Sequence, residues 1–213
     1  VQSGATVTIE GGDFSGGKNH TLSADGNLIV KGGTFDQDPS AYKADDYTVQ
    51  INKDGKYEVL FAVAMVETTY YADLHEAMVA AKSGETVKLV NDVDLAGTVW
   101  EPVSFKGIFD GQDHIISNLT INKPGVPNTG FITSLNGTFK NVTFTNPTVT
   151  GGENTAVVAG RAGGAAALAE NITINGTIKV ETTHSGYARA GGIVGGWAYG
   201  NYKNITVDGG DKA

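Results

Sequence analysis

Ser117-Asn118-Leu119-Thr120-Ile121 is the first of four stretches with one pattern: Asn, an aliphatic residue, Thr, then an aliphatic or aromatic residue. The others are Lys140-Asn141-Val142-Thr143-Phe144, Glu170-Asn171-Ile172-Thr173-Ile174 and Lys203-Asn204-Ile205-Thr206-Val207. A strand that recurs at intervals like those between these stretches is typical of a solenoid, in which each winding stacks on the one before. The alternation predicts that the aliphatic side chains are buried and that Thr faces outward.

The repeated asparagines predict a structural ladder. Asn118, Asn141, Asn171 and Asn204 hold the same place in the pattern. Each side-chain amide can therefore bond the amide of the next winding. These asparagines also belong to Asn-x-Thr sequons, but their place in the strand repeat favours the ladder over glycan attachment.

Composition excludes several classes of protein. The 213 residues include 30 glycines and 18% charged residues, which favours short strands joined by many turns. The net charge of −8 argues against a nucleic-acid partner. The chain has no cysteine, so disulfides, thiolate catalysis and cysteine-ligated metals are excluded. The strongly apolar run Val59–Val66 is far shorter than the roughly 20 residues that span a bilayer, so we expect no membrane insertion.

The N-terminal part of the chain carries a repeat of its own. Thr6–Phe14 is echoed by Asn27–Phe35, and both contain a Gly-Gly pair and a Phe. We expect the glycines to make the corner between strands, where positive φ is needed, and Phe14 to stack on Phe35 inside. Alternating residues on both sides of Lys53-Asp54-Gly55-Lys56 predict a β-hairpin. Residues 1–66 are thus predicted to be the end windings of a preceding β-helix block, followed by this hairpin.

One helix is predicted at the start of the second domain, residues 67–213. Its apolar positions recur at helical spacing at Leu74, Ala77, Met78 and Ala81. Asp73 can cap its start, with Glu76 completing a capping box, and Gly84 can end it. A solenoid needs a cover for its exposed end, and we expect this helix to provide one; an ordinary connecting helix is the alternative. Thr86–Val90 then predicts the first strand.

Two families resemble parts of this chain. Gly191–Trp197 followed by Asn204–Gly209 resembles the GLUG repeat of bacterial surface proteins, and weaker copies lie at 130–151 and 157–176. Tyr71–Val90 is similar to the helical cap and first strand of pectate-lyase-like right-handed β-helices. Together the resemblances imply an all-β fold, a right-handed parallel β-helix, within a large extracellular protein of the bacterial cell surface. The repeat is poorest at Ala159-Gly160-Arg161, where bulky apolar residues are expected.

Aromatic residues provide the candidate binding site. Trp197, Tyr199 and Tyr202 are predicted to lie in one loop beside Tyr187. Such rings stack on sugars or form protein contacts, which suits host glycans or host surface proteins as partners. The alternative is that they cover the end of the stack.

Carboxylates are weaker candidates. Asp110 and Asp113 could act as acid and base or hold a cation, but an Asp-Gly sequence is equally common turn chemistry. A second acidic group could attract calcium but lacks the spacing of known calcium loops; it comprises Asp36, Asp38, Asp45 and Asp46. His75-Glu76 begins like a zinc-protease motif, but Val79 occupies the position of the second histidine.

These observations predict a non-catalytic structural or adhesive segment of a bacterial surface protein, with no cofactor and with neighbouring domains of the same long chain as partners. Two alternatives remain open at this stage. One is a polysaccharide-active β-helix enzyme, a lyase or glycoside hydrolase, built on exposed carboxylates and on Arg161 and Arg189. The other is a self-associating fibre segment, because the ends of stacked windings can pair with each other.

Overall fold

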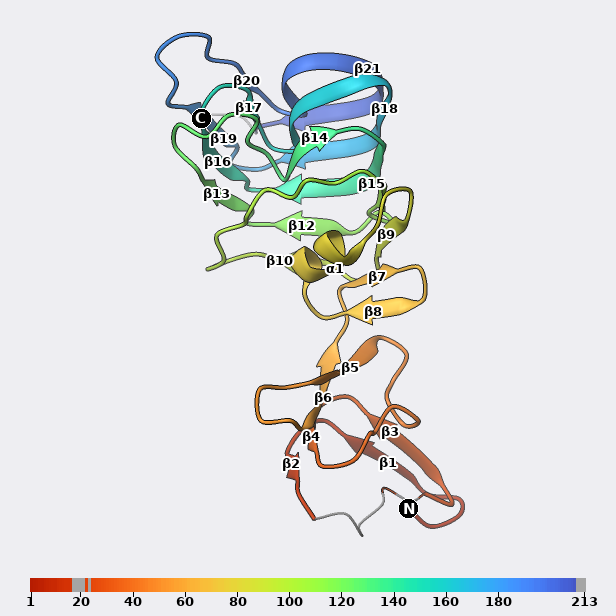
Figure 1. Cartoon of the computed structure of the whole chain (residues 1–213). Coiled ribbons are helices and arrows are strands. Elements are labelled where there is room, and N and C mark those ends of the chain that lie inside the picture. The colour runs from red at the N-terminus through yellow and green to blue at the C-terminus, as the bar shows by residue number, and fades with distance from the viewer. Residues whose placement is uncertain (17–21, 23, 210–213) are drawn as a thin grey trace. The chain divides into compact units, whose positions relative to one another are not determined.

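The computed structural model describes residues 1–16, 22 and 24–209 and shows a mostly β chain with one short helix (Figure 1). The chain divides into two compact units. The first is formed by Val1–Val63 with Tyr70–Ala72, and the second by Ala64–Thr69 with Asp73–Ala213. In the described part of the chain, no helix is long and apolar enough to cross a lipid bilayer.

The first unit repeats its strands in parallel. β1 (Thr6–Ile9) pairs with β3 (Asn27–Val30), and β2 (Asp13–Phe14) pairs with β4 (Gly33–Phe35). In both pairs each residue faces its counterpart in the sequence repeat, because Thr6 faces Asn27 and Phe14 faces Phe35. The internal repeat read from the sequence is therefore a repeat of the structure.

The glycine corners are confirmed at the second glycine of each pair. Gly12 and Gly33 have φ values of +117° and +108°, which side-chain-bearing residues rarely adopt. The two phenylalanines stack as predicted, with ring centroids 4.8 Å apart and planes 7° apart. Only Phe35 is inside, however, because Phe14 is 40% exposed. The prediction that both rings are interior is wrong for Phe14, which covers the outer face of Phe35.

The predicted hairpin is present. β5 (Tyr47–Ile51) and β6 (Tyr57–Phe61) are antiparallel, and β6 also pairs with β4. The turn is closed by the Asn52 side chain, which accepts from the backbone N–H groups of Asp54 and Lys56 at 3.0 and 3.1 Å. The core of the unit is a cluster of four buried residues: Leu28, Val30, Phe35 and Val59.

α1 (Leu74–Ala80) begins where the sequence predicts. The Asp73 carboxylate accepts a hydrogen bond of 2.8 Å from the backbone N–H of Glu76, so the cap is confirmed. The buried face consists of Leu74, Ala77 and Met78. The end was predicted wrongly. The helix stops at Ala80 because Ala81 is already extended, and Gly84, with φ of +90°, forms the separate turn that leads into the next strand.

Apart from α1, the described chain consists of strands and the connections between them. The strands outside the first unit are β7 (Ala64–Val66), β8 (Thr69–Tyr71, at the division between the units), β9 (Thr86–Leu89), β10 (Val93–Asp94), β11 (Ile108–Asp110), β12 (Ile115–Ser117), β13 (Thr120–Asn122), β14 (Ile132–Leu135), β15 (Thr138–Thr145), β16 (Thr148–Gly151), β17 (Thr155–Ala156), β18 (Ala159–Asn175), β19 (Lys179–Thr182), β20 (Ala190–Gly191) and β21 (Val194–Asp208).

From β9 onward, the strands of the second unit lie in parallel rows. One row runs β9-β11-β15-β18-β21, a second runs β10-β12-β15-β18-β21, and a third runs β13-β16-β19. Successive partners in the first row are Thr86, Ile108, Thr138, Leu168 and Asn201. Figure 1 shows these strands layered one above another. The mostly β fold with parallel sheets and one short helix is thus confirmed, while the right-handed solenoid stays a prediction.

The interior of these rows is filled by columns of inward side chains. The inward column of the first row runs through Val87, Phe109, Phe139, Ala169 and Tyr202. Phe109 and Phe139 stack at 4.3 Å between ring centroids, as do Trp100 and Phe131. The buried indole N–H of Trp100 donates to the carbonyl of Phe131 at 2.9 Å, so its polar atom is satisfied.

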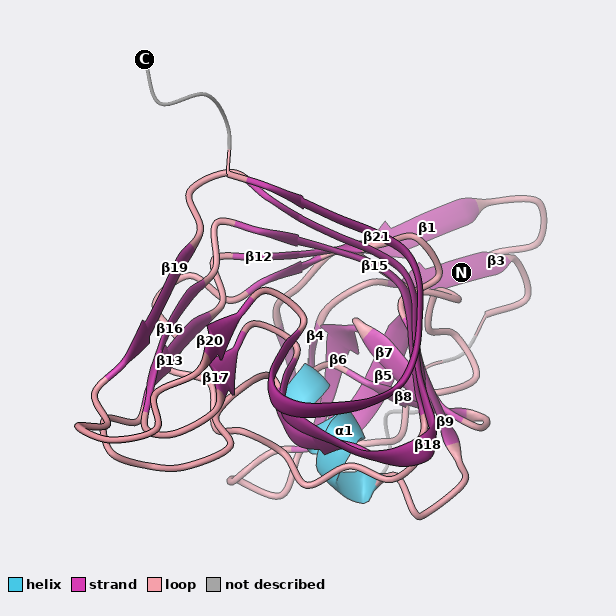
Figure 2. Ribbon diagram, turned by 90° about the horizontal axis from the view of Figure 1, so that it is seen from above, coloured by secondary structure: helices cyan, strands magenta, loops and turns pink. Residues whose placement is uncertain are grey.

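α1 lies at the β9–β10 end of the rows. Viewed along the stack, it lies partly inside the outline of the strands (Figure 2). Its His75 ring meets the buried Trp100 ring edge-on at 5.1 Å. The helix therefore stands where a cover for the first layer was expected.

Candidate functional site

The predicted aromatic site is built mainly on a strand. Trp197, Tyr199 and Tyr202 belong to β21, so placing them in a loop was wrong; Tyr187 alone lies in a connection, between β19 and β20. Pairing with β18 is present on both sides of Gly200, at Tyr199 and Asn201, while the register shifts at Gly200 itself, whose φ is +142°. Neighbouring strands have overridden local turn propensity here.

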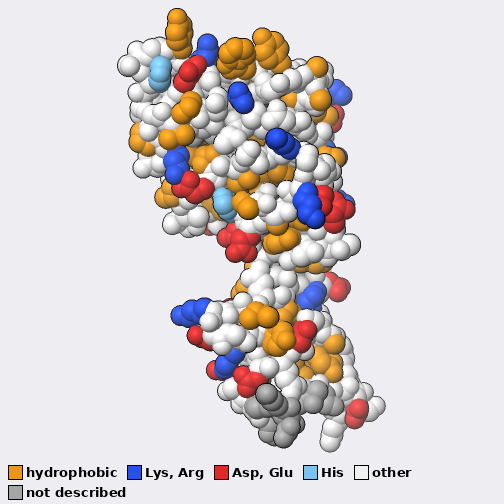
Figure 3. Space-filling view, viewed as in Figure 1, with side chains coloured by type: hydrophobic (Ala, Val, Ile, Leu, Met, Phe, Trp, Pro, Cys, Tyr) orange, Lys and Arg blue, Asp and Glu red, His pale blue; other side chains and the backbone are white. Residues whose placement is uncertain are grey.

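Trp197 occupies an irregular position of that strand. The register against β18 shifts beside it, between Arg161 and Ala162, and Trp197 has φ of +52°. An extra residue in one strand is a β-bulge, which redirects side chains, and positive φ is uncommon for a bulky residue. The exposed fractions of Trp197 and Tyr199 are 61% and 62%, and their ring centroids are 6.4 Å apart. In Figure 3, hydrophobic side chains gather at this end of the second unit.

Tyr202 and Tyr187 behave differently from this pair. Tyr202 is the last member of the inward column above Ala169, and burial raises the pKa of its hydroxyl. It stands at the end of the core column and is 36% exposed, which favours the alternative interpretation that the ring covers the end of the stack. Tyr187 is exposed, and no ring contact joins it to the other three in the part of the chain that the structure describes. The aromatic site reduces to Trp197 and Tyr199.

The asparagine ladder is present with three of its four predicted members. Asn204 Nδ2 donates to Asn171 Oδ1 at 2.8 Å, and Asn171 Nδ2 donates to Asn141 Oδ1 at 2.8 Å. Asn141 Nδ2 then donates to Asp110 Oδ1 at 3.0 Å. Asn118 lies elsewhere, and its amide donates to Asp94 Oδ1 at 2.8 Å. Including Asn118 in one ladder was therefore wrong.

Backbone conformation explains why asparagine recurs. Asn118, Asn141, Asn171 and Asn204 have φ values of 59°, 55°, 53° and 50°. Asparagine tolerates this left-handed conformation better than most residues with a side chain. Asn118 can therefore turn the chain between β12 and β13, and the other three can bend β15, β18 and β21 while their amides bond a neighbouring layer. The spacing of the asparagines predicted the ladder but not this conformation, although four Asn residues before short strands are a signal for it.

Asp110 is a structural carboxylate at the base of the ladder. Burial alone would raise its pKa, but hydrogen bonds from Asn141, Gln112 and Lys140 outweigh this and lower the pKa of Asp110 below its usual value. The bond from the Gln112 backbone N–H is the turn chemistry that the sequence suggested, and the ammonium of Lys140 lies 3.1 Å from Asp110 Oδ2. Asp113 is exposed, so the two carboxylates have different surroundings.

A second amide ladder was not predicted. Asn154 Nδ2 donates to Asn128 Oδ1 at 3.0 Å, and both residues have positive φ. Arg189 Nη1 donates to Asn154 Oδ1 at 3.0 Å and to Glu153 Oε1 at 2.9 Å. Arg189 thus has a carboxylate partner, although none was evident in the sequence.

The predicted metal candidates do not assemble into a site. Among the described residues, no group of three or more His, Asp or Glu side chains is placed to hold a metal ion. In the acidic group of the first unit, Asp36 lies 3.8 Å from Lys56, and Asp38 accepts from the backbone N–H of Ser40. His75 packs against Trp100, while Glu76 is exposed on the helix surface.

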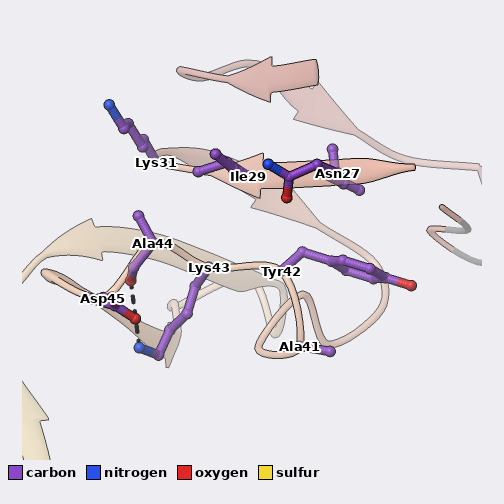
Figure 4. Close-up of a pocket in the computed structure, with 9 residues that line it drawn as sticks. Asn27, Ile29, Lys31, Ala41, Tyr42, Lys43, Ala44 and Asp45 are labelled. Atoms are coloured by element: carbon purple, nitrogen blue, oxygen red, sulfur yellow. Dashed lines mark hydrogen bonds between the residues drawn. The ribbon is translucent and has the colours of Figure 1, made fainter. Parts of the chain in front are cut away.

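The first unit contains an open pocket of about 390 Å³. It is lined by one edge of β3 and by the segment that follows β4 (Figure 4). Lys31, Lys43 and Asp45 provide its charged groups, and the Lys43 ammonium donates to the carbonyl of Ala44 at 3.5 Å and lies 5.4 Å from the Tyr70 ring centre. These charges have mixed sign, and Lys43 is already engaged in local contacts, so the pocket defines no ligand class.

Comparison with known proteins gives one informative relative. Over 127 residues the chain is 32% identical to a protein named halomucin from Haloquadratum walsbyi (strain DSM 16790 / HBSQ001). The match covers 51% of this chain and 1% of that relative, so the chain spans only a very small part of its length. No protein-family model and no solved structure matches the chain.

Proposed function

We propose that the chain is a rigid structural segment of a large cell-surface protein, and that its second unit is a right-handed β-helix. The observation that carries the proposal is the Asn141–Asn171–Asn204 ladder, whose bonds join asparagines of successive, sequence-distant strands. Parallel strands linked by crossover connections are right-handed in about 98% of cases, which supports the hand. The implied GLUG-type, pectate-lyase-like architecture belongs to the same proposal.

The similarity to halomucin supports the proposed location at the cell surface. A chain that matches about 1% of a very long protein suits a repeated or spacer element, and the name halomucin suits a protein on the outside of a cell. We therefore propose an extracellular location and neighbouring domains of one long chain as partners.

A rigid spacer should unfold as one cooperative block, because the strand rows join each layer to its neighbours. Native-state hydrogen exchange can test this. We expect the amides of β15 and β18 to exchange together at the slowest rate, and Asn171→Gly to accelerate exchange across both strands. Independent exchange of individual layers would contradict a rigid spacer.

A second candidate, ligand binding, is favoured by the exposed pair Trp197 and Tyr199. Their tilted rings stand on a bulge that redirects them, a geometry suited to sugar rings or protein side chains. An array of host glycans and host surface proteins tests this with the wild type and with Trp197→Ala/Tyr199→Ala. Tyr187→Ala is the matched control, because it removes an exposed ring outside the pair. Binding that survives the double variant would reject this site.

The catalytic alternative receives less support. The buried carboxylate Asp110 is held ionised by three donors, which suits a structural anion better than a proton donor. A reducing-sugar release assay on the same glycans tests the point. Turnover that Asp110→Asn or Asp113→Asn abolishes would establish the enzyme instead.

A further inference from the structure

We propose that the edge of β21 that faces away from β18 binds an extended strand of the form acid-Asn-aliphatic-Thr-aliphatic, aligned parallel to β21. In the described chain, β21 pairs with β18 on one side only, and Figure 1 shows it as the outermost layer of the rows. A strand edge offers unpaired backbone donors and acceptors, which an added strand can satisfy. Three independent features of this edge specify the chemistry of the added strand.

The first feature is the polarity of the asparagine ladder. Every bond runs in one direction, from Nδ2 of the later asparagine to Oδ1 of the earlier residue. The lower end is closed by the carboxylate of Asp110. At the upper end, Asn204 donates to Asn171, and no hydrogen bond to Asn204 Oδ1 is found among the described residues. That oxygen is positioned to accept from an amide in the next layer, as Asn171 Oδ1 accepts from Asn204.

The second feature is a column of alternating charge. Residues in register, one position before the ladder, run Lys88, Asp110, Lys140, Glu170 and Lys203. Opposite charges in direct register stabilise neighbouring strands. The column ends on the ammonium of Lys203, which is 61% exposed and 3.9 Å from Glu170. An acidic residue continues this alternation, and a basic one would be repelled.

The third feature is the uncovered apolar positions. Ile205 and Val207 lie in register above Ile172 and Ile174, which are both fully buried. Val207 itself is 52% exposed. Two aliphatic residues on the added strand, one and three positions after its asparagine, would cover Ile205 and Val207.

The chain contains a strand of this form. Of the four repeated stretches, only Glu170-Asn171-Ile172-Thr173-Ile174 has an acidic residue before its asparagine, whereas the others have Ser117, Lys140 and Lys203. A synthetic peptide with the sequence of residues 168–175 is therefore the probe that best fits the edge.

The test is a titration of the ¹⁵N-labelled chain with this peptide, followed by NMR chemical shifts. We expect saturable shifts in β21, centred on Asn204, and few in β9 or β10. A peptide carrying Glu170→Lys should bind about two- to fivefold more weakly, and one carrying Asn171→Ala should also lose affinity. The protein variant Lys203→Glu should reverse the charge preference and bind the Glu170→Lys peptide better than the original one.

Lys179→Glu is the matched control, since it changes an exposed lysine of β19 in another row. The combination of the Lys203→Glu protein with the Glu170→Lys peptide also controls for misfolding. A protein variant that regains binding with the altered peptide must be folded. Absence of saturable shifts at β21, or shifts insensitive to both charge reversals, would overturn the proposal. Concentration-dependent dimerisation through β21 that excludes the peptide would also overturn it, by showing that a second copy occupies the edge.

Discussion

The side-chain amide of Asn171 donates a hydrogen bond of 2.8 Å to Oδ1 of Asn141, which belongs to the neighbouring strand of the row. Both residues have positive φ, so each asparagine does two things at once: it turns the chain and it joins two layers. The side chain of Asn171 is exposed. Its contribution to stability is therefore smaller than that of a buried polar pair.

The double role can be separated by substitution. Asn171→Gly keeps the positive φ accessible and removes the ladder bonds, so we expect a loss of about 0.5–1.5 kcal/mol in the free energy of unfolding per bond. Asn171→Ala removes the same bonds and adds about 1–2 kcal/mol for the left-handed backbone. Chemical denaturation measures both. Equal losses for Gly and Ala would contradict a conformational role for Asn171.

Asn154 reverses an expectation from the sequence. Its position outside the four repeated stretches predicts a loop in which replacement has almost no effect. The loop is confirmed, because Asn154 lies between β16 and β17, but its side chain is only 3% exposed and bonds both Asn128 and Arg189. We expect Asn154→Ala to lower the free energy of unfolding by about 2–4 kcal/mol, because it leaves buried partners unsatisfied and strains the backbone.

Asn122→Ala is the control for this prediction. Asn122 is exposed at the end of β13 and has no positive φ, so its replacement should change stability by less than about 0.5 kcal/mol. Similar effects of both substitutions in the same denaturation experiment would show that the second ladder contributes nothing.

Asp110 predicts a dependence of stability on pH. Its folded-state pKa lies below the ordinary value of 3.8, so folding favours the ionised form. The stability that Asp110 contributes is fully present above the unfolded-state pKa and is lost as the pH falls through the lower, folded-state pKa. The difference in unfolding free energy between wild type and Asp110→Asn should therefore be constant near pH 6–7 and shrink below about pH 4. A difference that stays constant down to pH 2 would show that the ionised carboxylate is not favoured by folding.

The repeats of the sequence predicted the strands because burial of alternate residues leaves a periodic pattern. Ile172 and Ile174 alternate with Thr173, and they lie in register with the equivalent residues of β15 and β21. Local chemistry also predicted the Asp73 cap and the hairpin around Gly55. These features depend on residues close together in the chain.

Features that depend on the exact alignment of layers could not be predicted in this way. Asn118 has the same local sequence as Asn141 but turns a different corner, and only the register of the rows distinguishes them. Gly160 seemed to weaken the repeat, yet a Cβ there would lie 2.1 Å from the carbonyl carbon of Asn128, in the layer before. Trp197, Tyr199 and Tyr202 were assigned to a loop, but pairing with β18 places them in β21. Contacts between layers decide all three cases.

The last prediction concerns the helix at the β9–β10 end of the rows. Leu74 and Met78 are 3% and 1% exposed, so replacing either by Asp would put a charge against the first layer of the core. We expect Leu74→Asp or Met78→Asp to lower the free energy of unfolding by at least about 3 kcal/mol, and to promote association through strand edges that the helix no longer protects. Val79→Asp is a matched control on the same helix, because Val79 is 62% exposed and its replacement should cost less than about 1 kcal/mol. Denaturation with analytical ultracentrifugation measures stability and association together. A stable monomer after Leu74→Asp would show that α1 is only a connection between β8 and β9, and that the first layer needs no cover.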